Sequence, residues 1–202
     1  MTFAKVATDA FKNIQLNAGV VLSTFDPATA TIQDADIMGA TSGGTNITAI
    51  PTFTDYGDDI DNCPKNTKEL KKLDSWEIKA TGTFISISDK TAKSLLALAD
   101  TDTQDTGHIT LRDEVKDEDF NDFWLVADYG EGGVIACHLM DALSTGGFQI
   151  QTGDRTKGQF AFEYTAHYSM KNQDKVPFEI YIKQDGTTFP HSSSGQTKEV
   201  AA

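Results

Sequence analysis

The chain has 202 residues, of which 39% are hydrophobic and 23% charged, and this excludes a largely disordered protein. Its net charge of −13, from 17 basic and 30 acidic residues, excludes a basic footprint for tight binding of nucleic acids or anionic membranes. No apolar run reaches the roughly 18 residues of a membrane span. Cys63 and Cys137 are too few for a disulfide scaffold, so we expect free thiols and folding in a reducing cytoplasm.

The first third of the chain predicts little regular structure. Residues 14–25 fit a strand pair or one bent strand kinked at Gly19, and Ile37 fits the start of another strand. Residues 39–75 predict a long loop that holds glycines, Pro51, an acidic block and then a basic block. The charged residues of this loop that are candidates for a contact between copies are Asp58, Asp59, Asp61, Lys65, Lys68, Lys71 and Lys72. Adjacent blocks of opposite charge fit half of a head-to-tail contact; the alternative is a solvated loop with a lysine-rich helical turn.

The middle of the chain predicts one helix between strands. Residues 73–87 alternate between apolar and polar positions and therefore predict a strand. Ser88 is a good N-cap for a helix over residues 89–99, which carries alanines and leucines at a spacing of three and four. A short strand is expected at 108–111, followed by an acidic loop. Residues 123–127 and 134–140 are apolar on both faces, so we expect both sides of these strands to be covered.

The clearest pattern lies in residues 145–170. From 158 to 170 every even position is apolar or aromatic, and every odd position except Ala161 is polar. With the alternating residues 148–151 and a turn between the two runs, this predicts an antiparallel hairpin whose longer arm spans roughly 40 Å. One face is expected to be dry; the other is wet and carries Gln149, Gln151, Gln159, Glu163 and Thr165. A last strand at 176–182 closes the fold, and residues 183–202 are expected to be a flexible tail.

Together these elements predict a single domain over residues 1–182. Its fold class is mainly β, an antiparallel β-sandwich or partial barrel with one flanking α-helix. No catalytic residue, metal site or cofactor is predicted. The four histidines are scattered, Cys137 and the adjacent His138 should lie on opposite strand faces, and the aspartates at 55–61 miss the EF-hand spacing. We therefore do not expect an enzyme.

Six stretches carry a resemblance to a known family, namely residues 13–19, 61–67, 73–77, 142–149, 157–169 and 177–182. Together they resemble the major tail protein, or tail tube protein, of long-tailed, non-contractile bacteriophages and prophages of Gram-positive bacteria. The resemblance implies a β-sandwich flanked by a helix, assembled into hexameric rings that stack head to tail. Two long hairpins per subunit would line the hollow tube, with wall strands also near 14–25 and 74–87. The loop at 39–75 would contact the next ring.

The resemblance implies a structural virion protein that forms the tail tube through which genomic DNA is ejected. The implied partners are further copies of the chain, the tape-measure protein, and the tail terminator and distal tail proteins. Assembly would take place in the host cytoplasm without a membrane, and DNA would pass without specific binding. The five wet-face residues would then face the lumen; none is Lys or Arg, as a wall that a polyanion slides past requires. Three alternatives are a decoration or receptor-binding β-sandwich of a virion, the tube protein of a contractile tail-like device, and a small β-rich hydrolase.

Overall fold

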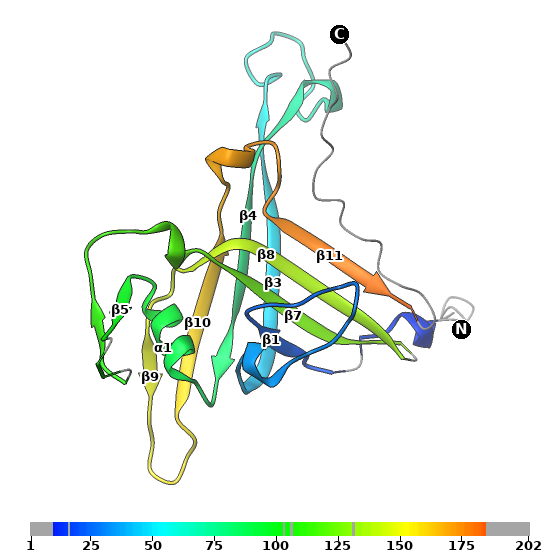
Figure 1. Cartoon of the computed structure of the whole chain (residues 1–202). Helices are drawn as coiled ribbons and strands as arrows, with labels where there is room; N and C mark the ends of the chain where they lie inside the picture. Colours follow the sequence, from blue (N-terminus) through cyan, green and yellow to red (C-terminus); the bar gives the residue numbers. More distant parts are fainter. Residues whose placement is uncertain (1–9, 16, 103, 106, 131, 185–202) are drawn as a thin grey trace, which may run out of the picture.

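A computed structural model describes residues 10–184 except 16, 103, 106 and 131. The described chain is mainly antiparallel β-sheet with one α-helix, as the sequence predicts (Figure 1). The strands are β1 (Val20–Leu22), β2 (Ile37–Gly39), β3 (Thr41–Asp55), β4 (Lys71–Phe84), β5 (Ala99–Thr101), β6 (Ile109–Leu111), β7 (Asn121–Tyr129), β8 (Gly133–Ser144), β9 (Gln149–Gln151), β10 (Gln159–Ala166) and β11 (Phe178–Lys183). The helices are α1 (Asp89–Leu96) and the 3-10 turns η1 (Ala10–Asn13), η2 (Asp34–Asp36), η3 (Lys68–Leu70), η4 (Asp117–Asp119) and η5 (Met170–Asn172).

Nine of the strands form one sheet, in the order β2-β1-β7-β8-β10-β4-β3, with β11 beside β8 and β9 beside β10. Strands β5 and β6 form a separate two-stranded sheet. Every pairing between these strands is antiparallel. In Figure 1 the β3–β4 ribbon rises well above the rest of the molecule, and the β9–β10 hairpin reaches below it. The sheet therefore extends beyond its packed centre at both ends.

The centre of the sheet is covered on both faces, as the apolar sequences of β7 and β8 predict. On one face α1 packs its fully buried Leu95 into a core cluster that includes Tyr164. The Tyr164 hydroxyl lies 2.9 Å from that of Ser94, and burial raises the pKa of Tyr164 to about 12, which keeps this hydroxyl protonated. On the other face Trp124 packs edge-on against Phe25 at 5.5 Å between ring centroids.

Helix α1 begins where the sequence predicts and ends earlier. The Ser88 side chain accepts a hydrogen bond from the backbone N–H of Thr91, which confirms the predicted N-cap. The Thr91 hydroxyl donates in turn to the carbonyl of Met38 in β2. Ala97 has a φ of +61°, which ends the helix at Leu96, three residues before the predicted end at position 99. The hydrogen bond from Thr91 to Met38 fixes the helix to β2.

The loop predicted over 39–75 is wrong for most of its length. Residues 41–55 form β3, a 15-residue strand, and only residues 56–70 connect it to β4. The glycines that indicated a loop, Gly43 and Gly44, lie at a register shift near the start of β3. Pro51, which indicated a break, is tolerated because β3 is the edge strand of the sheet.

Two further strand predictions need correction, and most of the predicted C-terminal tail lies outside the described residues. The arm predicted over 158–170 is regular only as the eight residues of β10, because a 3-10 turn at Met170–Asn172 follows. In the range 14–25 only Val20–Leu22 form a strand, and it pairs with β7 and β2 on the far side of the sheet from β4. Of the predicted tail, Lys183 belongs to β11, and residues 185–202 lie outside the described range.

An ion-pair network fixes the β5–β6 sheet to η4. The Arg112 guanidinium bonds the carboxylates of Asp100 and Asp119, and the Asp119 side chain is only 2% exposed. Burial alone would raise the pKa of Asp119, but Arg112 and the backbone N–H and charge of Lys116 lower it below its ordinary value of 3.8. The carboxylate is therefore stabilised as an anion in the folded state.

We expect the substitution Asp119→Asn to lower the free energy of unfolding by about 2 kcal/mol at neutral pH, because it removes the buried carboxylate that pairs with Arg112. Since the folded-state pKa is depressed, this stability is complete above the unfolded-state value near 3.9 and is lost as pH falls through the folded-state pKa. Denaturant unfolding at several pH values measures the effect. The difference between wild type and variant should shrink below about pH 4; a constant difference would contradict the assignment.

Candidate functional site

The wet face of the β9–β10 hairpin continues across β4 and β3. Residues directly opposite in an antiparallel pair share a face, and the register places Glu163 opposite Thr81, which lies opposite Asn46. The face so defined, called the wet wall below, comprises Gln149, Gln151, Gln159, Ala161, Glu163, Thr165, Thr83, Thr81, Lys79, Glu77, Asn46, Thr48, Ile50 and Thr52. All five residues predicted for the wet face lie on it. The structure adds the β4 and β3 rows, which the sequence prediction missed.

The opposite face of the same strands is dry. Phe162, Tyr164 and Ala166 of β10 are buried, and so are Ile78 and Ala80 of β4. On the wet wall, by contrast, Gln149, Gln151 and Gln159 are exposed, and Glu163 and Thr165 are partly exposed. The predicted division into a dry and a wet face is therefore confirmed along β10, whereas Phe148, Ile150, Tyr168 and Met170, which the prediction also placed on the dry face, are exposed.

The wet wall contains a single cation among its described residues, and two carboxylates pair with it. The Lys79 ammonium lies 2.6 Å from Glu77 and 3.7 Å from Glu163. The hydrogen bond to Glu77 and the attraction of its charge raise the pKa of Lys79, against a smaller opposing effect of burial, with Glu163 adding to the increase. Lys79 is therefore charged but neutralised. A negatively charged polymer beside these wall residues meets no unpaired positive charge, and the other lysines of the four strands, Lys71 and Lys72, lie at the far end of β4.

The two outer strands of the wet wall have free edges within the described chain. The wall runs β9-β10-β4-β3, and neither β9 nor β3 has a strand on its outer side. Each pairing is antiparallel, so β9 and β3 run in opposite directions. Residues 41–54 contain no charged residue, and the long β3 edge is interrupted by Pro51 and by two register shifts, at residues 41–45 and at Thr52/Phe53. Such an edge is a template for pairing with another chain.

The predicted contact residues lie together at the far end of the β3–β4 ribbon, in the segment at the top of Figure 1. This tip, residues 55–72, is held by its own hydrogen bonds. The Asp55 carboxylate accepts from the backbone N–H groups of Gly57 and Asn66, and Tyr56 N–H donates to the carbonyl of Leu70. The Thr67 hydroxyl donates to the carbonyl of Pro64 at 2.7 Å. The tip is thus an ordered projection.

The charges of the tip are exposed to solvent. All of the predicted contact residues are exposed there, namely Asp58, Asp59, Asp61, Lys65, Lys68, Lys71 and Lys72. Lys68 pairs with its neighbour Glu69 at 3.4 Å, and Lys71 donates to the Asn66 side chain at 3.0 Å. Within the described chain no ion pair joins the acidic block to the basic block. Both blocks therefore remain available to a partner.

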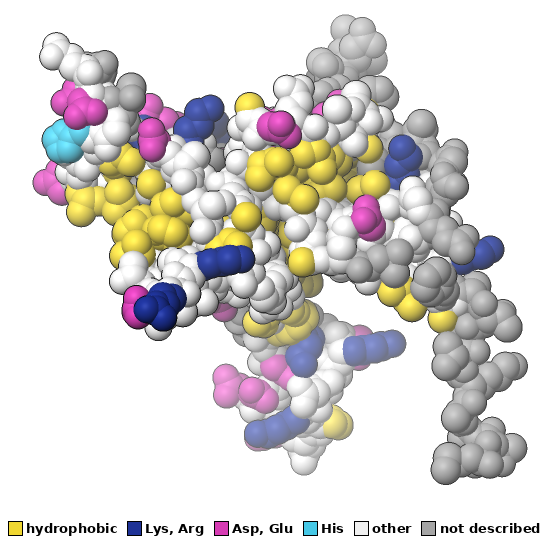
Figure 2. Space-filling view, turned by 90° about the horizontal axis from the view of Figure 1, so that it is seen from below, with side chains coloured by type: hydrophobic (Ala, Val, Ile, Leu, Met, Phe, Trp, Pro, Cys, Tyr) yellow, Lys and Arg dark blue, Asp and Glu magenta, His cyan; other side chains and the backbone are white. Residues whose placement is uncertain are grey.

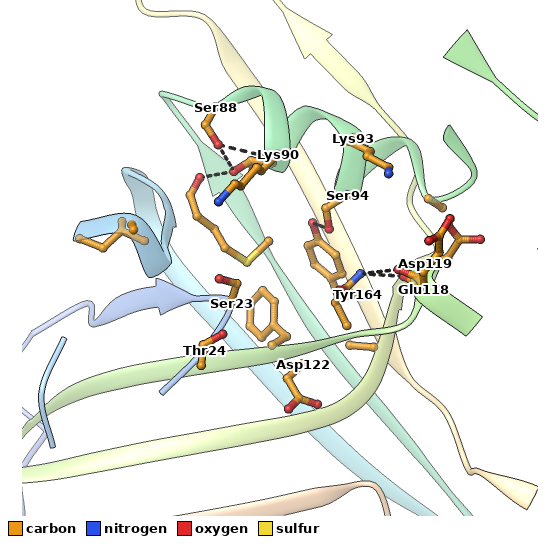
Figure 3. A pocket seen from close by; sticks show the side chains of 18 residues that line it. Ser23, Thr24, Ser88, Lys90, Lys93, Ser94, Glu118, Asp119, Asp122 and Tyr164 are labelled. Carbon is orange, nitrogen blue, oxygen red and sulfur yellow. Dashed lines mark hydrogen bonds between the residues drawn. The ribbon is translucent and has the colours of Figure 1, made fainter. Parts of the chain in front are cut away.

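A groove of about 370 Å³ between α1 and β7 is the other candidate site (Figure 3). Figure 3 shows the Tyr164 side chain in the groove, pointing to Ser94. Lys90 and Lys93 come from helix α1. Other lining residues in the view are Ser23, Thr24, Ser88, Glu118, Asp119 and Asp122. The charges around the groove are of both signs, and Asp119 is already paired with Arg112. No cluster of metal-binding side chains occurs among the described residues.

No model of a known protein family matches the chain, and no curated protein sequence matches it either. Within the part of the chain that the structure covers, no helix has the length and apolar character needed to cross a membrane. Both cysteines of the described chain are free thiols, as predicted.

Proposed function

We propose that this chain is a tail tube subunit of a long-tailed, non-contractile bacteriophage or prophage. Copies form hexameric rings, the rings stack head to tail, and genomic DNA passes through the bore into the host. The protein is structural, and its implied place is the virion tail. The observation that carries the proposal is the four-stranded wet wall, polar on one face, packed on the other and open at both edges.

The strand directions in the wet wall support closure of copies into a ring. Because the wall has an even number of strands, its outer strands β9 and β3 run in opposite directions. A β9 edge placed beside the β3 edge of the next copy is therefore antiparallel too. Repeating the unit in a circle gives an all-antiparallel barrel with no free edge, which is the arrangement that removes the exposed edges of a sheet.

The dimensions of such a barrel suit DNA. Six copies supply about two dozen strands, and at about 4.8 Å spacing with a tilt near 45° these close at a diameter of about 50 Å. Side chains leave a bore of roughly 40 Å, which is wider than a duplex. DNA carries about one charge per 1.7 Å, so an unpaired lysine on the wall would bind it. The pairing of Lys79 with Glu77 and Glu163 supports a wall along which DNA slides.

Negative-stain electron microscopy of the concentrated protein tests the proposal. We expect rings or hollow tubes with a bore near 40 Å. Monomers that bind glycans would instead support the decoration or receptor-binding β-sandwich, and tubes that require a surrounding sheath would support the contractile device. Monomers under all conditions, including with the tape-measure protein added, would contradict the tail tube proposal.

A further inference from the structure

The dry face of the wet wall is uncovered at the lower end of the β9–β10 hairpin. Phe148 and Ile150 are 39% and 54% exposed, and the Phe148 ring lies 5.9 Å from that of half-buried Phe160. Figure 2 shows hydrophobic side chains gathered on the left part of the face seen from below, the side on which α1, β5, β9 and β10 lie in Figure 1. Exposed apolar side chains that lie together are typical of an interaction surface. We call Phe148, Ile150 and Phe160 the hairpin patch.

A groove of about 530 Å³ lies beside the start of β3. Ile37, which is 37% exposed, and Thr41 are among its lining residues. Met38 and Ile87 also line it, and both pack in the core beneath the dry face, so this wall of the groove lies on the dry side of the sheet. The opposite wall includes Val20 of β1, which packs in the cluster of Trp124. We call this the β2–β3 groove.

The hairpin patch and the β2–β3 groove lie at the same end of the wet wall. Ile150 is opposite Phe160, Phe160 is opposite Phe84, and Phe84 is opposite Thr41. This single cross-strand row joins the patch at the β9 edge to the groove at the β3 edge. When the β9 edge of one copy meets the β3 edge of another, the patch and the groove therefore come to the same side of the joined sheet.

We infer that the hairpin patch of one copy packs into the β2–β3 groove of the adjacent copy. This contact rests on the proposed ring and assigns it a second, apolar layer outside the strand pairing. Strand pairing alone fixes two edges side by side and leaves Ile150 and Ile37 in water. Packing them against each other removes both apolar surfaces from water and fixes the angle between neighbouring copies.

The substitution Ile150→Ser tests the contact, with Ile180→Ser as a matched control. Both side chains are 54% exposed in the single copy, so neither change should unfold it, and circular dichroism checks this. The protein concentration at which rings or tubes first appear should rise about tenfold or more for Ile150→Ser, because a buried isoleucine is lost from every contact. It should stay unchanged for Ile180→Ser. Equal behaviour of the two variants would overturn the inference.

A disulfide trap separates this inference from the proposed function. Copies carrying Ile37→Cys and copies carrying Ile150→Cys, both with Cys63→Ser and Cys137→Ser, are mixed and oxidised. A mixed disulfide dimer is expected, and it would support the contact even if no tubes form, in which case the tail tube proposal alone fails. Tubes that yield no mixed disulfide would overturn the contact and leave the tail tube proposal standing.

Discussion

Reversing the charge of Lys65, Lys68 and Lys72 to Glu should abolish stacking of rings while leaving the subunit folded. These lysines are exposed on the ordered tip, and within the described chain they do not pair with its acidic block. In a head-to-tail contact the three glutamates would face the acidic block of the next copy. This repulsion costs several kcal/mol in total and raises the concentration needed for tubes by roughly a hundredfold or more. Sedimentation and electron microscopy measure the assembled fraction. Lys71 is left unchanged because it bonds Asn66 within the tip.

The control for this prediction reverses three lysines away from the tip, Lys12, Lys90 and Lys93, which gives the same change of net charge. It should assemble as wild type does. Normal tubes from the tip variant would remove the tip from the stacking contact. Equal loss in the control would show that total charge decides assembly, and this would also contradict the assignment of the tip.

Lysines placed on the wet wall should slow DNA ejection by about tenfold or more at low salt without preventing tube formation. The variant combines Gln151→Lys with Glu163→Lys, which adds two cations per copy and removes one carboxylate that pairs with Lys79. Cationic side chains displace counterions from DNA, so the retained DNA should be released as salt is raised. The measurement is the ejection rate from virions carrying the variant, at two salt concentrations.

The matched control for the wall variant places the same charges elsewhere, through Gln173→Lys and Glu114→Lys, both at exposed positions. Its ejection rate should equal that of wild type at both salt concentrations. Unchanged ejection by the wall variant would show that the wet wall does not face the passing DNA.

Local sequence patterns predict the parts of this fold that depend on near neighbours. The alternation around Phe162 predicts the two faces of β10, and Ser88 predicts the start of α1, because both signals act within a few residues. Strand β3 was missed because Gly43, Gly44 and Pro51 are usual loop formers. A glycine at a register shift and a proline on an edge strand are both compatible with a strand, but only the sheet shows which strand is the edge.

The candidate site was found only in part, for a related reason. The hairpin itself indicates Gln149, Gln151 and Glu163, but Lys79 joins them because β4 lies beside β10, a long-range pairing that no local pattern contains. The alternation of Asn46, Thr48 and Thr52 with apolar residues, interrupted only by Ile50, was a usable signal for the β3 row. Gly43, Gly44 and Pro51, which usually mark loops, outweighed this alternation in the prediction.

The long uncharged edge of β3 has a kinetic consequence under the proposed assembly. Every copy added to an open arc covers one such edge and exposes another, so growth by itself never reduces the number of reactive edges. Only the last copy, which closes the circle, removes both at once. Incomplete arcs are therefore the species most prone to aberrant aggregation, and rapid nucleation by an initiating protein complex would protect a cell that makes this chain in excess.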